Sequence, residues 1–551
     1  MQLYALRSGK SWGIGDLADL ALLADHAGRE HGADFILLNP LHAATPVLPQ
    51  EPSPYYPSSR RAWNPLYLRP EHCDGWGAAE GEDAQRLREL RGQGRALSDS
   101  ELIDRDAAFR CKDEALRICA AQPLAVDRQA AFTAFCAEGG EALIGLATAF
   151  ALARRHGPQI GDWPQDLRDR QPAAVRDATA ELEEEIRYQR WLQWQADVQL
   201  AAAQRAAGEA GMAIGVLTDL AVGVDAQGAD GWALADDLAR GVTVGAPPDA
   251  LAPRGQDWRL PPLRPDRLAA TGYRAFRELV GGNLRHAGGL RIDHVMGLFR
   301  LFWIPEGAEA TDGTYVRYDG EAMLAALALE ADRAGGIVIG EDLGTVEDGV
   351  RGAMAEAGVL GSAVFWFEQP EDGADERPAR AAEYRRLALT SVTTHDLPTV
   401  AGWATGEPAR VRAATGQLAG TAAEEQARAA EERRTLTDLL VAEGVLDDRS
   451  RSDADALVDA VHAFVARTPS LLVSAAPADA IGDLRQPNLP GTDGDTYPNW
   501  RLPVAEPAAP GEGGTDVDGL LPPSRPVMLE DLLVDPRVNR LAALLTEQRG
   551  S

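Results

Sequence analysis

Short apolar runs alternate with amphipathic helical stretches along the whole 551-residue chain. Eight such runs stand out, at Gln2–Leu6, Phe35–Leu38, Ile214–Thr218, Leu290–Asp293, Ile337–Glu341, Ala363–Phe367, Leu387–Thr393 and Ser470–Ser474. Helical periodicity between them is clear at Asp16–Arg29, Tyr188–Ala206, Tyr273–Arg285 and Glu321–Ala334. A repeated strand-then-helix pattern predicts an α/β fold with a parallel sheet covered by helices. Eight repeats favour a closed (β/α)8 TIM barrel over an open doubly wound sheet, which shares the pattern.

Two connections are much too long for simple crossovers between strands. Residues 39–187 separate the second run from the third, and residues 397–468 separate the seventh from the eighth. Both segments have mostly helical patterns, and loops of this length without structure are uncommon in compact domains. We therefore expect one barrel spanning residues 1–551, with two inserted helical subdomains on its catalytic face.

The charge balance limits the classes of partner. The chain has 54 Lys and Arg against 84 Asp and Glu, a formal net charge of −30. Such a surface repels nucleic-acid phosphates and anionic lipids, and no basic patch offsets it. The longest apolar run, Ala142–Ala153, is shorter than the roughly 20 residues that span a bilayer. We expect no nucleic acid and no membrane as partners, and a neutral small molecule as substrate.

Several common motifs are absent. The first twelve residues lack the apolar core of a secretory signal, and the four cysteines have no CxxC spacing, which favours a reduced cytoplasmic protein. There is no P-loop, G-x-G-x-x-G or H-E-x-x-H pattern, so neither a nucleotide cofactor nor a metal is indicated. Residues Gly9–Gly13 satisfy G-x-S-x-G, but the hydrolase elbow with that pattern ordinarily follows several strands and this one follows the first.

Carboxylates follow the ends of four expected strands, where a barrel enzyme places its catalytic groups. These are Asp219, Asp293, Glu341 and Asp396. One such acid often caps the next helix, but capping does not explain four at one rim. Because neighbouring strands lie about 4.8 Å apart, Asp293 and Glu341 can place their carboxyl groups about 5 to 5.5 Å apart, the separation of a retaining glycosidic mechanism.

Charge pairing predicts different protonation for the two acids. Arg291 precedes Asp293 by two residues, so both lie on one strand face, and the guanidinium is expected to keep Asp293 ionised. Glu341 has no such partner and is expected to carry the raised pKa that a proton donor needs. Asp396 is expected to face this pair from across the barrel.

Longer motifs accompany these acids in a fixed order. They are QLYALRSGKSWGIGDLADL (2–20), NPLHAATP (39–46), SPYYPSSRRAWNPLYL (53–68), GAPPDALAPRGQDW (245–258), GLRIDHVMGLFRLFWIP (289–305), GEDLG (340–344), TTHDLPTVAGW (393–403) and RQPNLPGTDGDTYPNWR (485–501). With them the chain resembles the α-amylase clan of glycoside hydrolases. It resembles more closely the 4-α-glucanotransferases of glycoside hydrolase family 77, the amylomaltases or disproportionating enzymes. Longer family members carry a β-rich domain before the first motif, whereas this chain begins almost on the first expected strand.

The resemblance implies roles for particular residues. Asp293 would be the nucleophile, Glu341 the acid/base and Asp396 the stabiliser of the transition state. The sugar contacts that it implies are Arg291, His294 and His395 in the donor site, Asp219 at the third strand, and Asp249, Gln256 and Trp258 in a mobile loop at 245–258. The loop has Ala250 where many relatives carry an aromatic residue. Other implied cleft positions are Ser53, Tyr55, Asn64, Phe367 and Asn488, of which Phe367 also fits a barrel core residue.

The implied activity is α-1,4-glucan transfer without a cofactor. The enzyme would hold the non-reducing part of a maltooligosaccharide on Asp293 and pass it to the 4-hydroxyl of another glucan or of glucose, releasing glucose or short maltosaccharides. An α-glucan hydrolase of the same clan remains an alternative, because hydrolysis and transfer differ only in the acceptor. A non-catalytic glucan-binding protein is a second alternative, although such a protein has no need for the three acids.

Overall fold

Parallel strands form the centre of the computed structural model, which describes residues 1–248, 254–370, 377–418, 420–508 and 519–550. One sheet has the order β1 (Phe35–Leu37), β4 (Gly215–Leu220), β7 (Gly289–Ile292) and β10 (Ile337–Gly340). A second has the order β11 (Gly361–Val364), β12 (Ala388–Ser391) and β13 (Leu472–Ser474), and a β-bridge between Ile339 and Leu360 joins the two. Each of these strands overlaps one of the runs expected from the sequence, although β4, β7 and β11 extend beyond the expected bounds.

The prediction of a first strand at Gln2–Leu6 is wrong. Residues Leu3–Ala5 form a 3-10 helix, and no ladder joins β13 to β1 among the described residues. The amino terminus still lies beside β1, because the Met1 amino group donates to the Leu37 carbonyl and the Asn39 N–H donates to the Met1 carbonyl. The Asn39 side chain accepts the Leu3 N–H at 2.7 Å, which directs this backbone group away from a strand partner.

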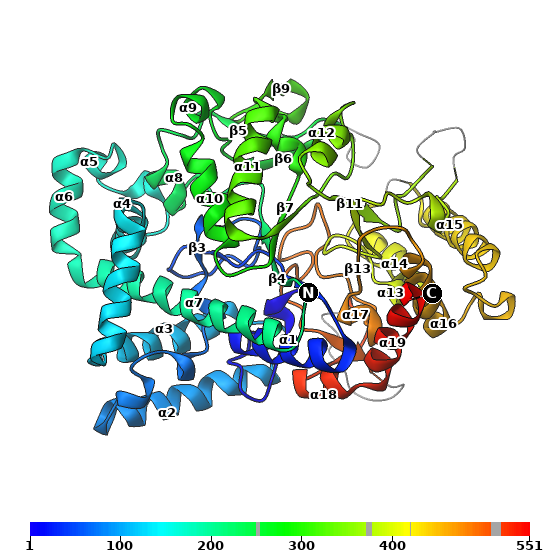
Figure 1. Cartoon of the computed structure of the whole chain (residues 1–551), viewed down its shortest axis with the longest axis horizontal. Coiled ribbons are helices and arrows are strands. Elements are labelled where there is room, and N and C mark those ends of the chain that lie inside the picture. Colours follow the sequence, from blue (N-terminus) through cyan, green and yellow to red (C-terminus); the bar gives the residue numbers. More distant parts are fainter. Residues whose placement is uncertain (249–253, 371–376, 419, 509–518, 551) are drawn as a thin grey trace.

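Apolar side chains on both faces hold the parallel sheet in place. All four residues of β7 are buried, as expected for a parallel strand covered on both faces. Inside the sheet, Leu217, Ile339 and Leu389 from three different strands pack together. On the outer face, α10 (Arg274–Leu284) and α11 (Gly320–Ala334) share a hydrophobic cluster with β7 and β10 (Figure 1). This packing brings the carboxyl ends of the strands to one rim.

Helices occupy both long connections. Residues 39–187 contain α2 (Gly81–Ala96), α3 (Arg105–Ala121), α4 (Val126–His156), α5 (Gln165–Arg168) and α6 (Pro172–Glu181), and α7 (Glu183–Glu209) leads back to β4. Residues 397–468 contain α13 (Val400–Thr405), α14 (Glu407–Ala414), α15 (Ala422–Ala442) and α16 (Ala454–Ala466). The two groups lie on opposite sides of the strands (Figure 1). The other helices are α1 (Leu17–His31), α8 (Ala229–Ala233), α9 (Pro265–Ala270), α12 (Val350–Glu356), α17 (Pro477–Ala480), α18 (Leu529–Val534) and α19 (Pro536–Gly550).

Among the described helices, α4 is the one whose length and apolar composition would allow it to cross a membrane. It is two helices joined by a kink at Gly140, where φ is 48° and ψ is −143°. The apolar second half is largely buried: Leu146, Phe150 and Leu152 pack in a cluster with Trp163. The apolar run noted in the sequence is thus a core helix of this fold.

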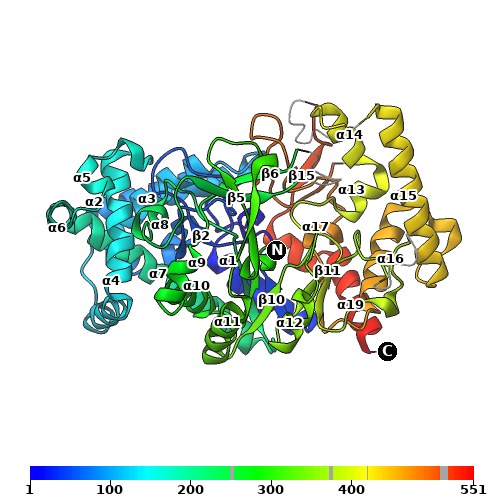
Figure 2. The same ribbon diagram turned by 90° about the horizontal axis from the view of Figure 1, so that it is seen from above.

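An antiparallel sheet stands over the parallel strands and was not predicted. Its order is β6 (Gln256–Leu260), β5 (Val242–Ala246), β8 (Arg300–Pro305) and β9 (Thr314–Arg317) (Figure 2). Gly245 in β5 and the charged residues Asp257 and Arg259 in β6 interrupt the apolar pattern, so the sequence of these two strands is typical of a loop. Two short pairs also form, β2 (His42–Ala43) with β3 (Ser59–Trp63) and β14 (Ala505–Pro507) with β15 (Ser524–Pro526).

A buried ion cluster joins the first helix to the first long connection. Asp16 caps α1 by accepting the Ala18 and Asp19 N–H groups, and the Asp19 side chain accepts the Asp16 N–H in return. The guanidinium of Arg69 donates to both carboxylates, and all three side chains are at most 4% exposed.

We expect Arg69→Met to lower the free energy of unfolding by about 3–5 kcal/mol, because it leaves two buried carboxylates without their cation. Urea unfolding followed by circular dichroism measures this change. Arg29→Met is the matched control, since Arg29 pairs with Asp25 on the same helix but both side chains are about half exposed. That control should change stability by less than about 1 kcal/mol. Equal losses in the two variants would contradict the prediction.

Candidate active site

The ends of four parallel strands bring the predicted acids to one rim. Asp219 lies in β4, while Asp293 and Glu341 directly follow β7 and β10. The pairing register matches Ile292 with Gly340, so the two acids that follow them lie at the same level on neighbouring strands. The Glu341 N–H donates to the Ile292 carbonyl at 2.9 Å, which continues the ladder to the acid itself.

One arginine connects two of these acids. Arg291 is buried in β7, and its Nη1 donates to Asp219 at 2.7 Å while its Nη2 donates to Asp293 at 3.0 Å. The Tyr55 hydroxyl donates to the second oxygen of Asp219 at 2.7 Å. A cavity of about 680 Å³ is lined in part by Tyr55, Asp219, Arg291 and Glu341. These four side chains therefore border a cavity, whose lining does not include Asp293 or Asp396.

Burial raises the pKa of both central acids. It raises the pKa of Asp293 to about 6, and the attraction of Arg291 only partly offsets it. Burial also raises the pKa of Glu341, against the charge of Arg291 and two backbone bonds, from the His294 N–H at 2.9 Å and the Leu343 N–H at 2.6 Å. The expectation from the sequence was that Asp293 would stay ionised and that only the pKa of Glu341 would be raised. The raised pKa of Asp293 contradicts that expectation. The reason is that burial of Asp293 outweighs the attraction of Arg291, and the neighbouring charges of Asp219 and Glu341 raise its pKa further.

Asp396 follows β12 and has a different environment. Its carboxylate accepts the Asn488 amide at 2.6 Å and lies 3.4 Å from His395 Nε2. Burial disfavours the charged form, but the charge and hydrogen bond of His395, with the Asn488 bond, lower the pKa of Asp396 below its usual range. This side chain is 43% exposed, which leaves it open toward a ligand.

His395 connects Asp396 to the Arg291 cluster. Burial opposes its charged form, but Asp396 outweighs burial and raises the pKa of His395. Its Nδ1 lies 3.0 Å from the Tyr55 hydroxyl. That hydroxyl donates its single proton to Asp219, so it accepts from the ring nitrogen of His395. The Tyr55 and Trp500 rings lie against the imidazole, with centroids 4.3 and 5.3 Å away.

His294 turns the chain immediately after Asp293. Its backbone is left-handed, with φ 48° and ψ 61°, a conformation that non-glycine residues adopt rarely and often at functional sites. Burial lowers the pKa of its imidazole, which favours the neutral form. The Trp258 ring of β6 meets it edge-on at 5.2 Å, and Gln256 accepts the Trp258 indole N–H at 3.0 Å. The antiparallel sheet thereby brings both predicted loop residues to the cluster.

Other predicted residues have local contacts instead. Ser53 accepts the Tyr55 N–H at 3.2 Å and Asn64 caps the short helix Pro65–Tyr67, so no printed bond joins either side chain to the acids. Phe367 is 47% exposed, which excludes the barrel-core interpretation. Asp249 lies outside the described residues.

Three residues near the acids were missed as individuals. Trp500 and Gln486 lie within the 485–501 motif, so that motif was the available signal; Gln486 donates to the Asp396 carbonyl at 2.6 Å. Asp342, adjacent to Glu341, is fully buried and binds the guanidinium groups of Arg385 and Arg351. Among the described residues, no group of three or more His, Cys, Asp or Glu is placed to hold a metal ion.

Comparison with known proteins assigns the chain to a family. The model of glycoside hydrolase family 77, described as 4-alpha-glucanotransferase, matches residues 1–507. The chain belongs to this family. Two curated relatives agree over nearly the full chain. The 4-alpha-glucanotransferase of Mycobacterium tuberculosis is 46% identical over 550 residues, covering 98% of this chain and 74% of the relative. That of Haemophilus influenzae is 33% identical, covering 92% of this chain and 75% of the relative.

Solved structures of family 77 agree with the fold. Amylomaltase from Corynebacterium glutamicum is 38% identical with a TM-score of 0.88, covering 99% of this chain and 74% of that one. Amylomaltase from Streptococcus agalactiae, solved in complex with acarbose, is 17% identical with a TM-score of 0.72, covering 100% and 98%. The chain therefore has the mixed α/β fold of the amylomaltases, which are glycosyltransferases of carbohydrate metabolism.

The raised pKa of Asp293 predicts a stability effect with a definite sign. The folded protein holds this proton more tightly than the unfolded chain, whose Asp pKa is about 3.9. The group therefore stabilises the fold at acid pH, and that contribution is lost as the pH rises through about 6. We expect Asp293→Asn to raise the free energy of unfolding at pH 7.5 by up to about 3 kcal/mol and to change it little at pH 4.

Urea unfolding of wild type and variant at the two pH values measures this difference. Asp25→Asn, which removes a half-exposed carboxylate of α1, is the control and should change stability by less than about 1 kcal/mol at either pH. A variant that is less stable than wild type at pH 7.5 would show that the burial of Asp293 is fully compensated.

Proposed function

We propose that the chain is a retaining 4-α-glucanotransferase that moves α-1,4-glucan segments between maltooligosaccharides through a covalent intermediate on Asp293. The observation that carries this proposal is the placement of Asp293 and Glu341 at one level on neighbouring strands, in a chain of family 77. Neighbouring strands lie about 4.8 Å apart, which suits the carboxyl separation of about 5 to 5.5 Å in retaining enzymes.

The first step breaks the glycosidic bond. Asp293 attacks the anomeric carbon, and protonated Glu341 donates its proton to the departing oxygen, so the shortened glucan or glucose leaves as an alcohol. The buried position of Glu341 supports this role because it favours the protonated carboxyl. Asp293 must be ionised to attack, and Arg291 at 3.0 Å favours that state.

The second step transfers the sugar. Glu341, now ionised, accepts the proton of an acceptor 4-hydroxyl, and that oxygen displaces the Asp293 carboxylate from the anomeric carbon. The two steps together leave the number of glycosidic bonds unchanged. Asp396 stays charged through its contacts with His395 and Asn488, and a carboxylate beside an oxocarbenium-like transition state stabilises its positive charge.

The remaining predicted residues serve as sugar contacts in this proposal. The imidazoles of His395 and His294 can each donate to a hydroxyl, and Trp258 offers an aromatic face. The other proposed contacts are Arg291, Asp219, Tyr55, Gln256, Asn488, Ser53, Asn64, Phe367 and Asp249.

The finer points of the architecture are proposed with the function. We assign the parallel strands to one (β/α)8 barrel. In this barrel the amino-terminal segment beside β1 takes the place of the first expected strand. Residues 39–187 and 397–468 are its inserted helical subdomains. The enzyme acts in the cytoplasm without a cofactor, on maltooligosaccharides and α-1,4-glucans, with glucose among its acceptors.

The product pattern from pure maltotriose distinguishes transfer from hydrolysis. Transfer conserves the number of glycosidic bonds, so we expect glucose and a ladder of longer oligosaccharides with little net gain of reducing ends. Chromatography of the products together with a reducing-end assay measures both. A steady rise in reducing ends without longer products would favour the hydrolase alternative, and binding without turnover would favour the glucan-binding alternative.

Near-isosteric variants separate the two central roles. We expect Glu341→Gln to lower turnover of maltotriose by about 10²- to 10⁴-fold, the range for loss of an acid/base. It should still release fluoride from α-maltosyl fluoride, because that leaving group needs no proton. Asp293→Asn should neither turn over maltotriose nor release fluoride. Fluoride release and bound-sugar mass on the protein measure the first step directly.

Glu321→Gln is the matched control, because Glu321 is an exposed acid in the first turn of α11. It should keep wild-type rates on both substrates. Identical behaviour of Asp293→Asn and Glu341→Gln with the fluoride would mean that the two roles are wrongly assigned.

A further inference from the structure

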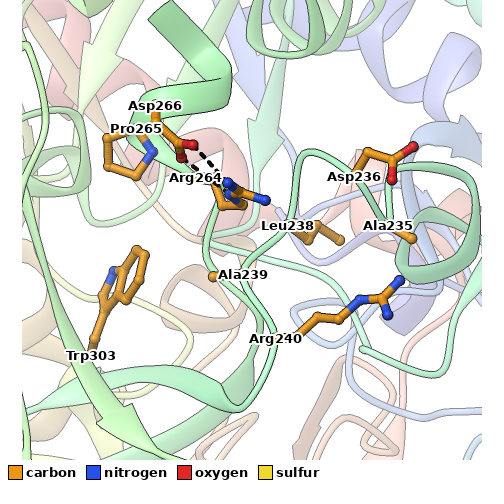
Figure 3. A pocket seen from close by; sticks show the side chains of 9 residues that line it. All are labelled: Ala235, Asp236, Leu238, Ala239, Arg240, Arg264, Pro265, Asp266 and Trp303. Atoms are coloured by element: carbon orange, nitrogen blue, oxygen red, sulfur yellow. Dashed lines mark hydrogen bonds and ion pairs between the residues drawn. The ribbon is translucent and has the colours of Figure 1, made fainter.

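A second cavity lies outside the catalytic cluster. Its volume is about 580 Å³, and it is formed where residues 235–240 and 264–266 meet the side chain of Trp303 on β8 (Figure 3). In Figure 3 the Trp303 indole stands on one side of this space, while Asp236 and Arg240 stand on the other. None of the residues assigned to the catalytic cluster lines it. We call this cavity the Trp303 pocket.

The side chains of the Trp303 pocket are of the kinds that bind a neutral sugar. A sugar ring presents C–H groups, which pack on an aromatic face, and hydroxyls, which both donate and accept hydrogen bonds. The pocket offers one partly exposed indole, two guanidinium donors on Arg240 and Arg264, and two carboxylate acceptors on Asp236 and Asp266.

The charge of the whole chain argues against an anionic ligand. Asp266 pairs with Arg264 and Asp236 pairs with Arg170, which leaves the single charge of Arg240 in a chain that carries −30. A phosphate or carboxylate ligand would lie beside both aspartates and in the field of an acidic protein. A polyhydroxyl ligand without charge experiences neither penalty, and it can use donors and acceptors together.

Existing contacts leave part of this polar set available. Arg264 and Asp266 bind each other, with Nη2 2.6 Å from Oδ2, and Asp236 binds Arg170 at 3.1 Å. Arg240 is exposed, and no described residue accepts a hydrogen bond from its guanidinium or forms an ion pair with it. A lone exposed arginine is ordinary on a surface. Here it faces a tryptophan across a cavity, which is the arrangement that a bound sugar ring would fill.

The antiparallel sheet connects the Trp303 pocket to the catalytic cluster. Trp303 and Trp258 both pack against the hydrophobic cluster of Val244, Leu260 and Leu301. The register matches Val244 with both Trp303 and Leu260, so these three side chains lie on one face, and Trp258 packs against the same cluster. Trp258 in turn contacts His294, the neighbour of Asp293. Both sites therefore lie on one face of this sheet.

We propose that the Trp303 pocket is a second binding site for a segment of neutral α-glucan, which holds long chains without taking part in bond cleavage. The choice of α-glucan rests on the proposed function. A chain that occupies both sites binds the second one intramolecularly, at a high effective concentration. Long glucans should therefore gain affinity from the pocket, whereas maltotriose should engage the catalytic cluster alone.

Arg240→Ala and Trp303→Ala test the proposal through a split between substrates. Loss of one hydrogen bond to a charged donor predicts about a tenfold rise in the KM for long amylose. Both the kcat and the KM for maltotriose should stay unchanged. Tyr315→Ala is the control, because Tyr315 is a 39% exposed aromatic residue on β9 of the same sheet and does not line the pocket. Arg240→Ala keeps the test decisive if Trp303→Ala is poorly folded, since the Arg240 side chain is exposed.

Calorimetric titration with maltoheptaose gives a readout that is independent of activity. The Asp293→Asn protein should bind maltoheptaose at two sites, and Asp293→Asn with Arg240→Ala should lose one of them. If wild type transfers glucans but the pocket variants keep the KM for amylose and the number of sites, the pocket proposal is overturned while the proposed function stands. A pocket that binds glucose 6-phosphate but not maltoheptaose also overturns it. Absence of transfer in wild type counts against the proposed function alone, because the titration still decides whether the pocket binds glucan.

Discussion

The ion pairs of the Arg291 guanidinium are the interaction on which the rim of acids depends. The guanidinium lies buried between the ends of β4 and β7 and provides the cation that both Asp219 and Asp293 contact. Without it, several carboxyl groups would share one poorly hydrated space, and their mutual repulsion would favour protonation or separation of the strand ends. With it, the acids remain close together, and part of the remaining electrostatic cost appears as the raised pKa of Asp293 and of Glu341.

A second charge system lies beside the first and behaves differently. His395 and Asp396 favour each other's charged forms, and the Tyr55 hydroxyl connects His395 to Asp219. The rim therefore combines acids that tend to hold protons with an acid that tends to stay ionised. Retaining glycosyl transfer requires a proton donor, an ionised nucleophile and a stabilising anion around the same sugar, so Arg291 must hold Asp293 ionised while Glu341 keeps its proton.

The antiparallel sheet gives the rim its outer wall. Its strand β6 carries Gln256 and Trp258 to His294, and its strand β8 carries Trp303 to a separate cavity. The hydrophobic cluster of Val244, Leu260 and Leu301 makes this sheet a single support for both places.

Local sequence patterns determined much of this protein. The strands of the parallel sheet were predictable because buried parallel strands are continuous apolar runs, and Asp293, Glu341 and Asp396 were identifiable because each follows such a run. Tertiary structure decided what depends on contacts between distant segments. The antiparallel sheet has an irregular sequence pattern, and it is held by cross-strand pairing and by a cluster of residues from three strands. Leu3–Ala5 became a 3-10 helix beside β1 rather than a strand. The protonation of Asp293 also follows from tertiary structure, because burial raises its pKa, and so does the charge of Asp219, which lies 72 positions from Arg291 in sequence.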